Sequence, residues 1–108
     1  MTVQGLCSLE IFDEIVISEP DREVEGVYIG DLLSWVMGRA NSGDAWITIM
    51  SNLNIIAVAS LADTSCIIVA EGVSLDEKVI ETAKQKGINV ISCECSMYDA
   101  AVFLSQVL

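Results

Sequence analysis

The triplet Cys93-Glu94-Cys95 is the part of the sequence best suited to chemistry. Residues two apart on a β-strand face the same side, so both thiols could bind one metal ion or form a redox pair. A zinc or iron–sulfur site needs about four ligands, and the chain has no histidine to complete the set. Cys66 falls in a neighbouring predicted strand and Cys7 is remote, so a full site would need thiols from a second copy of the chain. The alternative is that these cysteines are buried apolar residues, and we expect no cofactor.

Catalytic motifs of other kinds are not assembled in the sequence. The lack of histidine excludes a Ser-His-Asp triad, and the pairs Gly30–Asp31 and Gly43–Asp44 lack the pattern of a phosphate-binding loop. Turns account for both pairs. Asp31, Glu71 and Glu94 could provide paired carboxylates by topology only. We therefore expect a protein that is not an enzyme.

The charge of the chain excludes several classes of partner. Sixteen acidic residues against five basic ones give a net charge of −11, which repels phosphate backbones and anionic lipids. The uncharged run from Ala45 to Ala62 is as short as a membrane span can be, and polar residues interrupt it. The first ten residues lack the pattern of a signal peptide. We expect a cytoplasmic protein that binds neither nucleic acid nor membranes, with reduced thiols.

Strands and helices alternate along the chain. Apolar, β-branched runs predict strands over residues 13–18, 24–30, 44–50, 65–70 and 88–94. Helical patterns cover residues 31–40, 52–63, 74–87 and 96–108, after one or two helical turns near residues 3–11. Ser74 and Glu77 have the spacing of a capping box, and Gly87 is placed to end that helix. Serial strand–helix units predict a single α/β domain over residues 1–108, with a small, mostly parallel sheet.

Ligands of open parallel sheets bind beyond the carboxyl ends of the strands. The polar residues expected there, and hence the candidate ligand-binding residues, are Asp31, Ser51, Asn52, Asn54 and Ser96. Helix capping explains the same residue types equally well: Asp31 would cap the helix that follows it, and Ser51 or Asn52 the next one. A small-molecule sensor and a purely structural use of these residues therefore both stay open.

Two predicted helices carry more apolar surface than a domain of this size can bury. The helix over residues 52–62 is apolar nearly all round, and the closing helix over 97–108 has little polar cover. Surplus apolar surface favours self-association, although a helix sandwiched in the core is the alternative for either one. We expect a homodimer whose interface includes Leu53, Ile56, Val102 and Phe103.

The order of segments resembles the DRTGG domain family. The resemblance lies in "GVYIGDLLSWVMGRANSGDAWITIMSNLNIIAVASLADTSCIIVAEG" and "GINVISCECSMYDAAVFLSQVL", which cover nearly the whole chain. Its most specific parts are the Gly30–Met37 block, the entry to a strand at Gly43–Ile49 and the uncharged segment Asn52–Ala62. The literal Asp-Arg-Thr-Gly-Gly string is missing, and the comparable region reads Ser51–Asn54.

The resemblance implies a function of a particular kind. Members of the family are regulatory or accessory α/β domains, often dimerising, and occur alone or joined to CBS domains. Stand-alone members are similar to proteins encoded beside iron-only hydrogenase genes in anaerobes. The chain is therefore expected to be a homodimeric regulatory or protein-interaction domain, accessory to anaerobic hydrogen or energy metabolism. The alternatives are a sensor of a nucleotide-like molecule or metabolite, and a metal or redox accessory protein that uses Cys93 and Cys95.

Overall fold

A five-stranded sheet forms the centre of the molecule. The computed structural model describes all 108 residues. The strands are β1 (Asp13–Val16), β2 (Gly26–Ile29), β3 (Asp44–Thr48), β4 (Cys66–Val69) and β5 (Val90–Ser92). The helices are α1 (Val3–Cys7), α2 (Leu33–Arg39), α3 (Asn54–Ala62), α4 (Glu77–Lys86) and α5 (Met97–Val107). The expected α/β fold with alternating strands and helices is confirmed.

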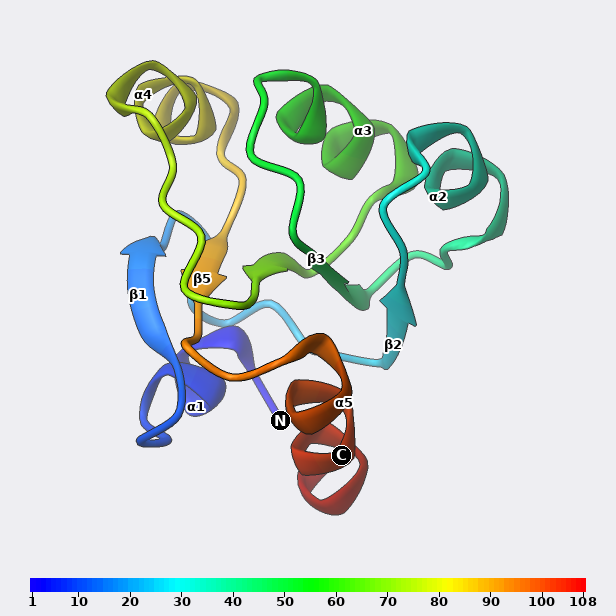
Figure 1. Cartoon of the computed structure of the whole chain (residues 1–108), viewed down its shortest axis with the longest axis vertical. Helices are drawn as coiled ribbons and strands as arrows, with labels where there is room; N and C mark the ends of the chain where they lie inside the picture. The colour runs from blue at the N-terminus through cyan, green and yellow to red at the C-terminus, as the bar shows by residue number, and fades with distance from the viewer.

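The strands lie in the order β1-β5-β4-β3-β2, and only β1 is antiparallel to its neighbour. From β2 to β5 the chain advances one strand at a time in one direction. Right-handed crossovers then place every connecting helix on the same face of the sheet. Figure 1 shows this layering, with α2, α3 and α4 on one side of the sheet and α1 and α5 on the other. All four parallel strands therefore end at one edge of the sheet, called here the carboxyl edge, and begin at the opposite amino edge.

The two faces of the sheet bury separate apolar clusters. Along β3, Ala45 and Ile47 belong to the cluster under α1 and α5, whereas Trp46 belongs to the cluster under α2, α3 and α4. This division follows from the alternation of side chains on a strand. Every residue of β3 and β4 is buried, as expected for central strands covered on both faces.

The ends of the helices agree only in part with the sequence predictions. Ser96 caps α5, because its Oγ accepts a hydrogen bond from the Asp99 N–H at 3.0 Å. Gly87 ends α4 in the left-handed conformation with a φ of 70°, which glycine adopts without strain. The predicted capping box of α4 is wrong, because Asp76 rather than Ser74 occupies the N-cap and makes no side-chain cap bond. No helix combines the length and the apolar character that a membrane crossing requires.

Candidate functional site

Asp31, the first candidate ligand residue, links the ends of β2 and β3. Its Oδ1 accepts hydrogen bonds from the Thr48 hydroxyl at 2.7 Å and from the Ile49 N–H at 3.0 Å. The expected helix cap at this residue is wrong: α2 is preceded by Leu32 and has no side-chain cap. The difference arises because β3 ends beside β2 and presents a hydroxyl and a free N–H to the carboxylate. Asp31 is thus occupied in holding the carboxyl edge together.

The other candidate ligand residues do not converge on one cavity. Ser51 and Asn52 are exposed in the loop between β3 and α3, where the Asn52 Oδ1 accepts a hydrogen bond from the Asn54 N–H at 2.9 Å. Asn54 lines a groove between α3 and α4. Ser96 caps α5 on the other face of the sheet. Asn52 and Ser96 therefore each satisfy a backbone N–H of the loop or helix that carries them.

A cavity of about 250 Å³ opens at the carboxyl edge, beside the ends of β4 and β5. Two serines, a glutamate and a majority of apolar side chains surround it. The lining residues are Ile15, Val69, Gly72, Val73, Ser74, Leu75, Ile80, Ser92, Cys93 and Glu94. Two backbone hydrogen bonds fix its mouth by joining the loops after β4 and β5: Glu71 N–H to the Cys95 carbonyl, and Gly72 N–H to the Cys93 carbonyl. None of the five candidate ligand residues lines this cavity.

The thiol pair lies in the loop that follows β5. The strand ends at Ser92, so Cys93 and Cys95 occupy the following loop, with the Cys93 Sγ 3.8 Å from the Cys95 carbonyl oxygen. No group of three or more His, Cys, Asp or Glu side chains is placed to hold a metal ion. Burial raises the pKa of the Cys93 thiol to about 12, and the neighbouring Cys95 thiol adds to the rise. Cys93 therefore stays protonated near neutral pH, whereas metal binding and nucleophilic attack need the thiolate.

The expected interface residues divide between surface and core. Leu53 and Val102 are exposed, but they lie on opposite faces of the sheet, before α3 and on α5. Ile56 is 1% exposed and packs in the core, which removes it from the surface. The Phe103 ring packs edge-to-face on Phe12, with ring centroids 6.0 Å apart. Of the four residues, only Leu53 and Val102 are left largely accessible to a partner.

A group of large apolar side chains is exposed where β2 and β3 end. Ile29 is the last residue of β2, Leu32 and Trp35 lie at the start of α2, and Ile49 and Leu53 lie between β3 and α3. They are between 40% and 57% exposed, and we call them the apolar corner. The Arg39 guanidinium lies 3.6 Å from the centre of the Trp35 ring and covers one side of it. Exposed aromatic and aliphatic side chains at one corner are typical of a contact surface.

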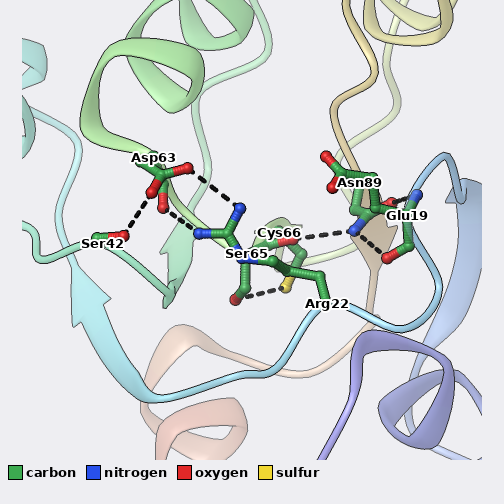
Figure 2. A network of polar contacts seen from close by, with 7 residues as sticks. All are labelled: Glu19, Arg22, Ser42, Asp63, Ser65, Cys66 and Asn89. Carbon is green, nitrogen blue, oxygen red and sulfur yellow. Dashed lines mark hydrogen bonds and ion pairs between the residues drawn. The ribbon is translucent and has the colours of Figure 1, made fainter.

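The amino edge carries a polar network that the sequence analysis missed. Asn89, just before β5, is 3% exposed. Its Oδ1 accepts hydrogen bonds from the N–H groups of Ser18 and Glu19, both at 2.8 Å. Its Nδ2 donates to the carbonyl oxygens of Glu19 at 2.9 Å and Ser65 at 3.0 Å. Figure 2 shows this amide between the segment after β1 and the start of β4.

A second branch of the network joins the same segment to the end of α3. The Arg22 guanidinium donates to the Asp63 carboxylate at 3.1 Å and to its carbonyl oxygen at 2.9 Å, and the Ser42 hydroxyl donates to the same carboxylate (Figure 2). The hydrogen bonds that Ser42 and Arg22 donate to the carboxylate hold the pKa of Asp63 below its usual range. Asp63 ends α3 in the left-handed conformation with a φ of 56°, which directs the turn toward Arg22. The only sequence signal for this site is an aspartate directly after a helix, a position that tolerates this conformation.

Comparisons with known proteins agree with this architecture. The DRTGG domain family matches residues 13–107. Among solved structures, the chain is similar to the CBS and DRTGG domains of the regulatory region of Clostridium perfringens pyrophosphatase, which were crystallised with the activator diadenosine tetraphosphate. The TM-score is 0.70 at 22% identity, and the match covers 90% of this chain but only 43% of that one. A search of curated proteins gives no match. The resemblance inferred from the sequence is thus confirmed, and the chain belongs to the DRTGG domain family.

Proposed function

We propose that the chain is a non-catalytic regulatory domain that acts as a homodimer through its apolar corner. Membership of the DRTGG family supports the regulatory role. The use of Asp31, Asn52 and Ser96 to satisfy loop and helix backbones supports a scaffold rather than a catalytic edge.

The exposure of the apolar corner carries the proposal of self-association. Leu32 and Trp35 are both about half exposed, although burying a large apolar side chain contributes roughly 1.5–3 kcal/mol. A two-fold interface places the same patch of each protomer against its copy. Aromatic anchors with a neighbouring arginine dominate such interfaces, and Trp35 with Arg39 provides this pair. The five residues of the corner carry no charge, but each protomer has a net charge of −11, so we expect added salt to strengthen the dimer by screening this repulsion.

Sedimentation velocity over a wide range of protein concentration tests this proposal. The wild-type chain is expected to sediment as a dimer, and the variant Leu32→Ser with Trp35→Ser as a monomer with a dissociation constant raised about 100-fold or more. Leu61→Ser is the matched control, because Leu61 is 73% exposed but lies at the far end of α3. Val102→Ser tests the expected surface of α5 in the same way.

Three outcomes would contradict the proposed interface. A wild-type monomer at every concentration would exclude self-association. Dissociation by Leu61→Ser alone would move the interface to the groove between α3 and α4. Dissociation by Val102→Ser alone would move it to the α5 face.

A small-molecule sensor is the second candidate, and the cavity at the ends of β4 and β5 favours it. Its volume of about 250 Å³ lies just below the roughly 300–1,000 Å³ of pockets that hold drug-sized ligands, so it suits a small metabolite or part of a nucleotide. The related pyrophosphatase region was crystallised with a nucleotide activator. We therefore propose a nucleotide-like molecule or metabolite as the ligand class.

Thermal unfolding with diadenosine tetraphosphate, ATP and AMP as probes tests the sensor. A ligand that prefers the folded state raises the midpoint temperature, and the rise grows with the logarithm of the ligand concentration once that concentration exceeds the dissociation constant. Ser74→Ala and Ser92→Ala should weaken that effect because both serines line the cavity. Ser34→Ala, on the exposed face of α2, is the matched control. The absence of stabilisation by any of the three probes would remove nucleotides from the ligand class.

The link to anaerobic hydrogen or energy metabolism rests on the family resemblance alone, and the cytoplasmic location on the lack of a signal-peptide pattern in the first ten residues. Co-purification of a tagged wild-type chain with a hydrogenase of its host would support the link. The Leu32→Ser, Trp35→Ser variant separates a partner that needs the dimer from one that binds elsewhere.

A further inference from the structure

A polar cavity of about 140 Å³ lies at the amino edge of the sheet. Ligands of parallel sheets are expected at the opposite ends of the strands, at the carboxyl edge. Three chain segments enclose it: the segment after β1, the turn from α3 to β4 and the turn from α4 to β5. Only two of its eleven lining residues are hydrophobic. An occupant of this cavity must therefore make polar contacts over most of its surface.

One lining residue holds a polar group with no partner. Thr64 is 8% exposed, and its Oγ1 is fully buried without a hydrogen bond. Leaving a buried hydroxyl unpaired costs about 1–3 kcal/mol, so such groups are rare in folded proteins. The oxygen has no accessible surface, so a ligand in the adjoining cavity can pair with this hydroxyl only after the Thr64 side chain turns toward it.

The charges that line the cavity divide into a used pair and a free pair. Arg22 and Asp63 bind each other at 3.1 Å. Lys86 and Glu19 also line the cavity, and neither takes part in an ion pair. One ammonium group and one carboxylate are thus available to a ligand.

The free groups match a molecule that carries one charge of each sign. A lone anion would meet Glu19 and Asp63, and a lone cation would meet Lys86 and Arg22, so either one would face repulsion. A zwitterion can direct its carboxylate to Lys86 and its ammonium to Glu19. The C-termini of α3 and α4 also end at this cavity, and the partial negative charge of helix C-termini favours an ammonium group.

The volume limits the size of the occupant. Since a water molecule takes up about 30 Å³ in the liquid, a cavity of about 140 Å³ has room for at least about five non-hydrogen atoms. We propose that this cavity binds a small α-amino acid, of the size of glycine, alanine or serine. The ligand bridges the segment after β1 to the ends of α3 and α4, and so adds to the contacts that Asn89 and Arg22 make there. This site is separate from the apolar corner, so the oligomeric state of the chain does not bear on it.

Thermal unfolding and isothermal titration calorimetry with glycine, L-alanine and L-serine test the proposal. At least one of the three is expected to stabilise the wild-type chain in a concentration-dependent way. Methylamine and acetate each carry half of the charge set and should have no comparable effect. Equal stabilisation by acetate alone would overturn the zwitterion and indicate an anion site. The absence of stabilisation by all three amino acids at millimolar concentration would overturn the site itself.

Charge variants test the location. Lys86→Gln and Glu19→Gln should each weaken binding roughly tenfold or more, since each removes one charge-assisted contact. Lys84→Gln and Glu81→Gln are matched controls on the exposed surface of α4, outside the cavity, and should bind as the wild type does. Unchanged affinity in Lys86→Gln and Glu19→Gln would overturn the site, even if an amino acid binds elsewhere.

Thr64→Val tests the unpaired hydroxyl while keeping the volume of the side chain. The expected result is weaker amino-acid binding with an unchanged or higher midpoint temperature in the absence of ligand, because the variant removes a buried unpaired polar group. A lower midpoint temperature would show that the hydroxyl already has a partner in the free protein, which overturns its role in the site.

Discussion

The two edges of the sheet use polar side chains in different ways. At the carboxyl edge, Asp31 and Asn52 satisfy backbone groups of loops close to them in the fold, and the surrounding surface is the apolar corner. At the amino edge, Asn89 and Arg22 join segments that lie 24 to 71 residues apart in the sequence. The side chains of Asp31 and Asn52 thus bind groups at most 18 residues away, whereas those of the amino edge hold the N-terminal segment on the domain.

This contrast reverses the usual expectation for a parallel sheet. Ligands of such sheets bind at the carboxyl edge, but there Asp31 is already occupied and the cavity is mostly apolar. Two residues of opposite charge without ion-pair partners, Lys86 and Glu19, line the cavity at the amino edge, whereas Glu94 is the one charged residue that lines the cavity at the carboxyl edge. The antiparallel β1 explains the difference, because its continuation passes over the amino ends of β4 and β5 and brings Glu19 and Arg22 there.

Removing Asn89 should give the largest loss of stability. Asn89→Ala deletes four hydrogen bonds and leaves the N–H groups of Ser18 and Glu19 and the carbonyl oxygen of Ser65 without partners, whereas the Glu19 carbonyl keeps the Arg22 N–H. Since each buried unpaired group costs about 1–3 kcal/mol and some can reach water, we expect the free energy of unfolding to fall by roughly 3 kcal/mol. Urea denaturation measures this as a lower midpoint.

The matched change at the carboxyl edge is Asn52→Ala. Asn52 accepts one exposed hydrogen bond, from the Asn54 N–H, so the expected loss is about 0.5–1 kcal/mol. Equal losses in Asn89→Ala and Asn52→Ala would contradict the view that the amino edge carries the long-range connections.

The elements of the fold could be predicted because each carries a local pattern. The buried run of β4 and the amphipathic stripe of α4 with Gly87 at its end both follow from neighbouring residues. Ser96, which was predicted as a candidate ligand residue, caps α5. The cap at Asp31 was predicted wrongly because Thr48, 17 residues away, competes for its carboxylate. Local patterns cannot reveal a competitor that only the folded sheet brings near.

The polar network at the amino edge could not be predicted from the sequence for the same reason. Glu19 and Arg22 lie in a segment whose charges suit a solvated loop, and Asn89 lies inside a predicted strand. Asn89 binds Ser65 and Arg22 binds Asp63, and these residues come close together only in the folded sheet. The candidate site at the carboxyl edge was predicted from topology, which places residues at an edge but does not tell which of them are already hydrogen-bonded.

Substituting Asp31 tests whether the carboxyl edge is structural. Asp31→Ala removes the acceptor of the Thr48 hydroxyl and the Ile49 N–H, so we expect a loss of about 1.5–2 kcal/mol in unfolding free energy. Asp31→Asn keeps an acceptor oxygen and should lose less than half as much. Both values come from urea denaturation. An unchanged stability in Asp31→Ala would instead leave the carboxylate free for a ligand.

The buried thiol at the amino edge should make stability depend on alkaline pH. Burial raises the pKa of Cys66 from 9.0 to about 12, so its stabilising contribution is complete below pH 9 and is lost as the pH rises toward 12. Between pH 8 and pH 10 the unfolded chain gains about 1.4 kcal/mol from ionising this thiol, whereas the folded chain gains almost nothing. Cys66→Ala should remove that part of the decline, measured by urea denaturation in a thiol-free reductant.

Cys93 at the carboxyl edge extends the thiol comparison. Burial also raises its pKa to about 12, so Cys93→Ala should remove a second part of the alkaline decline. A decline that persists unchanged in both Cys66→Ala and Cys93→Ala would contradict the raised pKa values of the buried thiols.

The ion pair of Arg22 with Asp63 should have the smallest effect of these changes. The side chains are 25% and 59% exposed, and exposed pairs contribute about 0.2–1 kcal/mol because solvent screens them. Asp63→Asn tolerates the left-handed φ of 56° and removes only the charge, so we expect a loss of about 0.5 kcal/mol at pH 7 that shrinks in high salt. The pKa of Asp63 is lowered, so this contribution is present above the ordinary pKa of 3.8 and disappears as the pH falls through the lower folded value. Wild type and Asp63→Asn should therefore converge in acid urea titrations, and a difference that persists there would mean that Asp63 acts through its hydrogen bonds rather than through its charge.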